Sequence, residues 1–330
     1  MGRNMNESRP RSRRWLLLLG VVILVAVPAY IELFLRRPVG SGSAGPKVAK
    51  APFDSVWTDR KILLFGIGDS VTRGLGAKSR SHTYFERLRQ NPSDEYDDMK
   101  GKCLSVVLPN LTSENVAVSG STSIEHLQTL QTRVTPFPDD MFGLVVMTTG
   151  GNDLIHSYGR RPPEEGAMYG ATLEQAEPWI VNFHERLNQI LDGLNERFPG
   201  GCLVYVGDIY DPTDGVGDAP SIFLPDWDDG LAIHARYNQT IRDVASAREN
   251  VHVVNLYETF LGHGSHCRQF WRAHYDHADP HYWFYDNIED PNDRGYDAIR
   301  RVFLNEIVRT RSQLNTQQTA PSPATLTSVR

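Results

Sequence analysis

Five short apolar runs, separated by longer stretches with helical spacing, constrain the fold of this chain more than any other feature. The runs are residues 62–65, 115–118, 144–148, 203–206 and 251–256. Between the third and fourth runs, apolar residues from Trp179 to Leu194 recur at steps of three and four, which predicts a helix, and residues 295–308 predict another. Strands that alternate with helices predict an α/β fold: a mainly parallel five-stranded sheet with helices on both faces.

The first apolar run leads into the residues that most strongly indicate catalysis. Residues 62–65 are followed closely by Gly68-Asp69-Ser70. Ligands of open α/β sheets bind at the carboxyl ends of the strands, where a serine is well placed to act as a nucleophile. The same tripeptide is also typical of an ordinary turn, in which Ser70 would only cap a helix. By itself it therefore leaves both interpretations open.

Two further strand ends carry groups that would complement a nucleophilic serine. Gly120 follows the second run, and its lack of a side chain lets a backbone N–H approach a ligand closely. Asn152 follows the third run, and its side-chain amide is a second donor. Donors that converge on a reacting carbonyl stabilise the oxyanion of the tetrahedral intermediate. The simpler interpretations are a loop glycine and a helix cap.

In this order and at this spacing, the motifs resemble those of the SGNH (GDSL-type) hydrolase superfamily. The resemblance covers most of residues 60–310 and rests on the Gly-Asp-Ser at 68–70, the lone Gly120 and the Gly-Gly-Asn-Asp at 150–153. It implies a flavodoxin-like three-layer sandwich and ester hydrolysis by Ser70. It also implies an oxyanion hole made by the N–H groups of Ser70 and Gly120 and the side chain of Asn152, with no cofactor and no metal ion.

The last motif departs from the family pattern, which reads Asp-x-x-His-Pro-Asn followed by Gly-Tyr. Here the segment 286–296 reads Asp-Asn-Ile-Glu-Asp-Pro-Asn-Asp-Arg-Gly-Tyr, which puts Asp290 where the histidine should be. The family's aspartate position falls on Asn287, or on Asp286 if one residue is inserted. This matters because a serine hydroxyl needs a base, and a carboxylate is a weak one unless burial raises its pKa.

A loop upstream of this motif offers histidines as alternative bases. It carries five of them, at positions 263, 266, 274, 277 and 281. We expect His266 or His263 to be the base, oriented by one of three acids: Asp286, Glu289 or Asp290. The alternatives are a solvated, aromatic-rich surface loop and a metal site at His263-x-x-His266-Cys267. That spacing lacks the paired ligands of a zinc module.

The N-terminus has the pattern of a membrane signal. Residues 1–14 are rich in arginine, and residues 15–35 are apolar apart from Glu32. As a helix this stretch would cross a hydrocarbon core of about 30 Å, and it is longer than the apolar core of most cleaved signal peptides. We expect an uncleaved, single-pass signal anchor with its basic flank in the cytoplasm. Secretion after cleavage is the alternative.

Beyond the anchor, composition divides the chain into three parts. Residues 36–52 are rich in Gly, Ser and Pro and predict a flexible linker, residues 53–311 form the catalytic domain, and residues 312–330 predict a disordered tail. Within the domain, residues 208–230 after the fourth run are a candidate lid, or else an ordinary surface loop. The net charge of −6, with charges of both signs interspersed, argues against a nucleic-acid partner.

The expected protein is a membrane-anchored serine esterase that faces outward and removes short acyl groups through an acyl-enzyme on Ser70. An acetylated polysaccharide or a lipid ester would suit that location. Two alternatives stay open. One is a binding or scaffold protein that kept the fold but lost its base at Asp290, and the other is an acyltransferase. The oligomeric state is not indicated by the sequence.

Overall fold

The computed structural model describes residues 11–315. Most of the predicted basic flank, 1–14, and most of the predicted tail, 312–330, lie outside the described residues. The described chain folds around one parallel sheet of five strands in the order β2-β1-β3-β4-β5. The strands are β1 (Lys61–Gly68), β2 (Leu111–Asn115), β3 (Met141–Thr148), β4 (Cys202–Gly207) and β5 (Val251–Val254).

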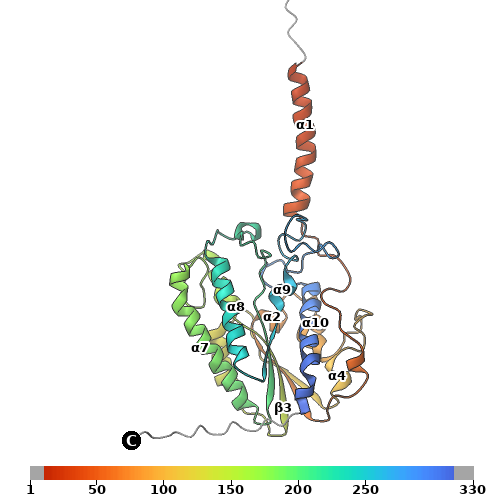
Figure 1. Ribbon diagram of the computed structural model, residues 1–330, viewed down its shortest axis with the longest axis vertical. Helices are drawn as coiled ribbons and strands as arrows, with labels where there is room; N and C mark the ends of the chain where they lie inside the picture. The colour runs from red at the N-terminus through yellow and green to blue at the C-terminus, as the bar shows by residue number, and fades with distance from the viewer. Residues whose placement is uncertain (1–10, 316–330) are drawn as a thin grey trace, which may run out of the picture.

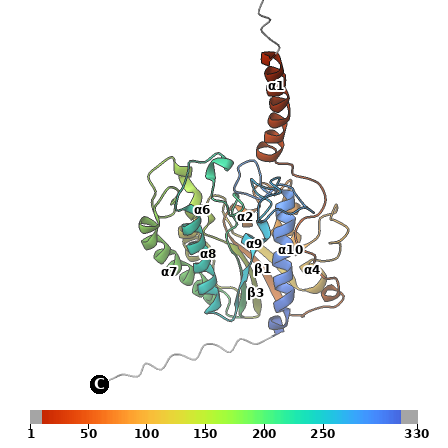
Figure 2. The same cartoon turned by 45° about the horizontal axis from the view of Figure 1, so that its top comes forward.

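Helices cover both faces of this sheet, as Figures 1 and 2 show. One face carries α5 (Ser123–Arg133), α7 (Leu173–Arg197) and α8 (Gly230–Ser246), and the other carries α3 (Tyr84–Arg89), α4 (Leu104–Val107), α9 (Leu256–Phe260) and α10 (Asp293–Thr310). Alternate residues of β1 feed the two cores, because side chains on a strand point to opposite faces. Leu63 and Phe65 pack under α7, whereas Ile62 and Leu64 pack under α10. This confirms the predicted three-layer α/β fold.

The strand order fixes where a ligand would bind. In a flavodoxin-like sheet of this order, the chain adds strands first on one side of β1 and then on the other, starting with β3. The crevice at the carboxyl ends of β1 and β3, where this strand order reverses, is the usual ligand site. β1 and β3 are paired in parallel from Lys61 with Met141 to Gly68 with Thr148. Two short helices follow them, α2 (Ser70–Arg73) and α6 (Gly151–Ile155). The segments around Ser70 and Asn152 therefore lie at this switch point.

One predicted strand was placed wrongly. The apolar run 115–118 was expected to form the second strand, but β2 is Leu111–Asn115. β2 is an edge strand with a largely exposed, polar surface, so its sequence lacks the apolar signal. The apolar run follows it, and the N–H groups of Val116 and Val118 still donate to the carbonyls of Gly66 and Gly68, at 2.8 and 2.9 Å.

The N-terminal helix stands apart from the domain. α1 (Arg11–Tyr30) continues into a short π-helix (Ile31–Leu35). Residues 15–35 have the length and composition of a membrane-spanning helix, a property that N-terminal signal sequences share, and none of this stretch is buried by the domain. Figure 1 shows α1 projecting from one end of the molecule.

The segment predicted to be a flexible linker packs on the domain instead. Ala44 and Val48 are buried, and the N–H of Ala44 donates to Oδ2 of Asp297 in α10 at 3.0 Å. Gly45 lies so close to α10 that an added Cβ would come within 2.6 Å of the Cα of Ala298. Small residues thus serve close packing here rather than flexibility. The domain also extends past residue 311, because Leu314 in the short helix η6 (Arg311–Asn315) is buried.

Candidate active site

Ser70 begins helix α2 immediately after β1, and the turn before it is tightly held. Gly68 has a φ of +137°, and a Cβ there would come within 2.2 Å of the Thr148 carbonyl oxygen, so only glycine fits. Asp69 caps α2 by accepting a hydrogen bond from the N–H of Val71 at 3.0 Å, and it accepts a second from the hydroxyl of Thr148 at 2.7 Å. These contacts fix the Ser70 side chain at the carboxyl edge of the sheet.

The loop after β2 is tied to the same turn. The hydroxyl of Ser121 donates to the carbonyl of Gly68 at 3.2 Å. Asn152 of α6 is buried, and its side-chain Nδ2 donates to the carbonyl of Ser121 at 2.9 Å. Asn152 and Ser70 line one cavity, whereas Gly120 lies in a neighbouring shallow hollow with a φ of +80°. The expected oxyanion-hole residues are therefore linked through Ser121, and two of the three share the cavity.

Asp290 is the carboxyl group that the structure brings to Ser70. It lies fully buried in the loop before α10, and its Oδ2 accepts a hydrogen bond from Nδ2 of Asn287 at 2.6 Å. Burial raises the pKa of Asp290 above its ordinary value, and hydrogen bonds from the Ser70 hydroxyl and from Asn287 oppose that effect. Oδ1 of Asp290 is buried and has no hydrogen-bond partner in the described structure. Catalytic hydrogen bonds often tighten only when substrate binds.

Two more acids, Asp69 and Glu289, lie beside Ser70 and Asp290. Burial raises the pKa of Asp69 to about 6 and that of Glu289 to about 7. The hydroxyl of Tyr158 donates to Oε2 of Glu289 at 2.6 Å. Mutual repulsion contributes, since Asp290 raises the pKa of both neighbours. Within residues 11–315, no arginine, lysine or histidine is among the causes of these three shifts. We call Asp69, Glu289 and Asp290 the Ser70 acid cluster.

The histidines expected to act as the base lie elsewhere. Nε2 of His266 bonds to Oδ1 of Asp218 at 2.8 Å, and the ring of His263 stacks on Trp283 with ring centroids 3.5 Å apart. Neither histidine lines the cavity of Ser70. The reason is local, because the carboxylate of Asp214 accepts hydrogen bonds from three backbone N–H groups of this loop and anchors it. These N–H groups belong to Gly262, Gly264 and His266.

Of the three acids expected to orient the base, Glu289 and Asp290 lie at Ser70, while Asp286 is exposed to solvent. The metal alternative finds no support in the described part of the chain, where no group of three or more His, Cys, Asp or Glu side chains is arranged to hold an ion. His263, His266 and Cys267 are buried in their own loop.

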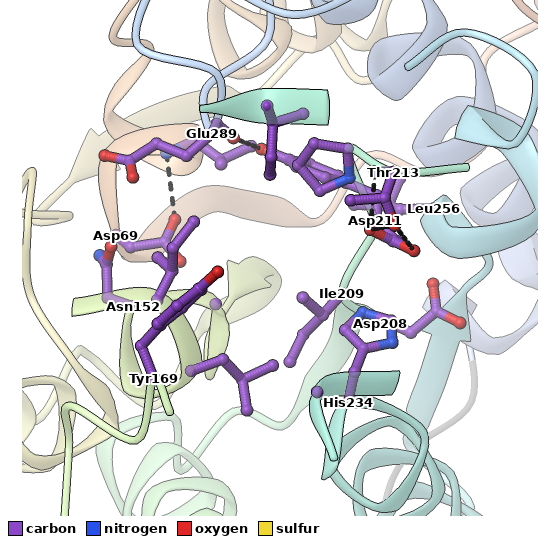
Figure 3. A pocket seen from close by; sticks show the side chains of 18 of the residues that line it. Asp69, Asn152, Tyr169, Asp208, Ile209, Asp211, Thr213, His234, Leu256 and Glu289 are labelled. Atoms are coloured by element: carbon purple, nitrogen blue, oxygen red, sulfur yellow. Dashed lines mark hydrogen bonds between the residues drawn. The ribbon is translucent and has the colours of Figure 1, made fainter. Parts of the chain in front are cut away.

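The cavity beside Ser70 has a volume of about 150 Å³ and mainly apolar walls. The segment 208–230, which the sequence left as a candidate lid or an ordinary surface loop, supplies one wall, and its apolar lining residues include Ile209, Ile222, Leu224 and Trp227. Figure 3 shows Asp69, Asn152 and Glu289 toward one end of the cavity and Asp208, Asp211 and His234 toward the other. The cavity therefore joins Ser70 to an apolar chamber with a polar far end.

His234, from α8, was not anticipated from the sequence. Its Nε2 is buried without a hydrogen-bond partner, and burial lowers the pKa of the ring, which favours the neutral form. It lies in the segment Leu-Ala-Ile-His-Ala-Arg at 231–236, which matches no catalytic motif, so no local signal distinguished it. Only the fold of the 208–230 segment over α8 brings it to the cavity.

Comparisons with known proteins identify the family of the chain. The model of the GDSL-like Lipase/Acylhydrolase family matches residues 67–298, a range that includes Ser70, Gly120, Asn152 and Asp290. No curated protein sequence matches the chain significantly.

Solved structures with similar folds include an acetylxylan esterase from Geobacillus stearothermophilus, with 15% identity over 76% of this chain and 94% of that chain (TM-score 0.48). A phospholipase A1 from Streptomyces albidoflavus NA297 has 16% identity over 74% of this chain and 98% of that chain (TM-score 0.46). A lipase/acylhydrolase from Enterococcus faecalis has 18% identity over 76% and 96%, respectively (TM-score 0.43).

Proposed function

Because this chain belongs to the GDSL-like lipase/acylhydrolase family and is a serine ester hydrolase, we propose that Ser70 is its nucleophile and Asp290 its general base. Oγ of Ser70 attacks the ester carbonyl carbon while the hydroxyl proton moves to Asp290. The N–H groups of Ser70 and Gly120 and Nδ2 of Asn152 then donate hydrogen bonds to the oxyanion. On collapse, the alcohol leaves with the proton from Asp290, and a water molecule activated by Asp290 releases the acid from the acyl-enzyme.

The observation that carries this proposal is the contact between the Ser70 hydroxyl and a buried carboxyl group whose pKa is raised. A base is most effective when its pKa lies near the working pH, and burial moves an aspartate in that direction. Charge is also conserved at the site, because Asp290 becomes neutral as the oxyanion becomes negative. No cation is then needed to balance the base.

Glu289 would support this balance. With a pKa of about 7, it holds a proton over much of the range below neutral pH, so the negative charge beside Ser70 stays on Asp290. The hydrogen bond from Tyr158 to its Oε2 keeps the Glu289 side chain in place. Glu289 is thus a positioning and charge-limiting residue rather than a second base.

We extend the proposal to location and substrate. Residues 15–35 would act as a signal anchor that holds the domain of residues 53–311 on the extracytoplasmic side, where it removes short acyl groups from a polysaccharide or lipid ester. The apolar walls of the cavity also favour a second activity, acyl transfer to an alcohol, since they limit access of water. Formation of an ester product from added glycerol would identify transfer.

The direct test is hydrolysis of p-nitrophenyl butyrate by the full chain in detergent. Ser70→Ala should reduce kcat/KM to the background rate without lowering the midpoint of thermal unfolding. Ser246→Ala, at an exposed serine near the end of α8, is the matched control and should retain full activity. Activity that survives in Ser70→Ala would contradict the proposed nucleophile.

A further inference from the structure

The carboxyl edge of the sheet faces the end of the domain from which α1 projects. In Figures 1 and 2, α2, which begins at Ser70, lies between the sheet and that end, while α10 ends at the opposite end of the domain. The segment between the apolar span and the domain packs on α10 and is not free. If α1 spans a membrane, the catalytic edge therefore faces the membrane.

Direct contacts join the end of the apolar span to this face of the domain. Phe34, inside the span, packs on Trp271 with ring centroids 5.8 Å apart. Arg268 forms an ion pair with Glu32 at 2.5 Å. Since Phe34 and Glu32 belong to the last turns of the span, Trp271 must lie at the depth of the membrane interface.

The cavity wall formed by residues 221–224 also contacts the segment that follows the apolar span. The guanidinium of Arg37, two residues after the span, donates to the carbonyl of Ser221 and lies 5.4 Å from the ring centroid of Phe223. Ile222 and Leu224, on either side of Phe223, line the cavity. One short segment thus presents Phe223 outward and its two neighbours to the cavity of Ser70.

The aromatic side chains on this face are unusually exposed. Phe223, Phe270 and Trp271 are 80%, 66% and 48% exposed. Phe223 also has a φ of +64°, a left-handed conformation that is costly for a bulky residue. Exposed aromatic side chains near arginines are typical of membrane interfaces, where rings enter the headgroup region.

We propose that Phe223, Phe270 and Trp271 form a membrane-docking surface, and that the enzyme acts on esters carried by molecules resident in that membrane. This inference rests on the proposed function. The occupant is the bilayer that holds α1, because the docking surface contacts the end of the span itself. The volume of the cavity, about 150 Å³, suits an acyl group of about six carbons, since an apolar protein cavity of that size holds one benzene molecule.

The experiment presents one acyl group in two ways to the full chain in lipid nanodiscs. The substrates are 1-palmitoyl-2-hexanoyl-glycerol within the nanodisc and p-nitrophenyl hexanoate in solution. The variant Phe223→Asn/Phe270→Ser removes two docking side chains, and asparagine tolerates the left-handed backbone at position 223 better than phenylalanine does. The control is Val106→Asn, at an exposed residue of α4, away from α1 in Figure 1.

We expect the double variant to lose about tenfold or more of its activity on the membrane substrate relative to the soluble one, because two apolar side chains no longer enter the bilayer. Val106→Asn should leave this ratio unchanged. An unchanged ratio in the double variant, with soluble activity intact, would overturn the docking proposal. Absence of Ser70-dependent hydrolysis of the soluble ester in the unmodified chain would instead refute the proposed function.

Discussion

The protein buries two groups of carboxylates in opposite ways. Around α10, Glu95 and Asp297 are fully buried, and Asp98 lies beside them; these three acids pair with three arginines, Arg87, Arg300 and Arg301. We call this set the arginine–carboxylate cluster. The Ser70 acid cluster also has three acids, but no cation of the described residues, 11–315, is among the causes of their pKa shifts.

The difference separates a structural role from a chemical one. A buried charge that is paired keeps its ionised form, and its partners hold elements together, here α3, α10 and the loop at residues 95–98. An unpaired buried carboxyl group has a raised pKa, so it takes up a proton easily near neutral pH. Such a group is costly for stability and useful beside a nucleophile.

The largest effect on stability should come from breaking the arginine–carboxylate cluster. Arg300→Met leaves Glu95 buried without its arginine and removes one of the three arginines beside Asp297, which should cost about 3–5 kcal/mol of unfolding free energy. Chemical denaturation of the full chain in detergent at pH 7 measures this. The activity of each folded molecule should be unchanged, and a loss below about 1 kcal/mol would contradict a structural role for the cluster.

Neutralising an acid of the Ser70 acid cluster should raise the free energy of unfolding instead of lowering it. The folded protein holds a proton on Glu289 up to a pH of about 7, whereas an ordinary glutamate releases it near 4.5. The free energy of unfolding therefore falls as the pH rises between these two values. The Glu289→Gln variant has no carboxyl group at this position and should not show this decrease. The variant should be more stable than the parent by roughly 1–3 kcal/mol at pH 9 and equal to it near pH 4.

Denaturation of the Glu289→Gln variant and its parent across pH 4–9 provides the measurement. The glutamine side chain can still accept the hydrogen bond from Tyr158. A variant that is less stable than its parent at pH 9 would show that Glu289 is paired and ionised in the folded protein.

The smallest effect should come from the exposed edge of the arginine–carboxylate cluster. The side chain of Asp98 is 48% exposed, and a hydrogen bond from Arg301 is the main cause that lowers its pKa. Because solvent screens this pair, Asp98→Asn should cost no more than about 1 kcal/mol at pH 7. The difference should vanish in acid, where the aspartate of the parent is protonated. A cost as large as that of Arg300→Met would show that burial does not decide the strength of these pairs.

The sequence predicted well the part of the site that the strand ends carry, because the topology of the sheet decides where those ends lie. Ser70 and Asn152 follow apolar strands whose carboxyl ends must meet at the switch point, so their neighbourhood followed from pattern alone. Helix α5 went unpredicted because its sequence is largely polar and few of its residues are buried. Helix α8 does carry a buried stripe, at Ile233, Tyr237, Ile241 and Val244, so its sequence held a usable signal.

The candidate bases were predicted from residue type, and the structure places both histidines outside the cavity of Ser70. The Pro291-Asn292 landmark marks the segment that does reach Ser70. The side chain of Asn292 caps α10 and donates to the carbonyls of Tyr282 and Phe284, at 2.8 and 3.1 Å. These bonds fix the loop that carries Asp290 against Ser70. The position of a residue relative to the Asn292 cap, rather than the presence of histidines nearby, decides which side chain reaches Ser70.

The central claim is that Asp290, and not a histidine, takes the proton of Ser70. Its most direct test is kcat/KM for p-nitrophenyl butyrate at pH 8 in Asp290→Asn beside His263→Asn/His266→Asn, each corrected for the folded fraction. We predict a loss of about 10²- to 10⁴-fold in Asp290→Asn, the range for general-base catalysis, and a near-parental rate in the histidine variant. A near-parental kcat/KM in Asp290→Asn, with a loss of about 10²-fold or more in the histidine variant, would show that a histidine and not Asp290 is the base.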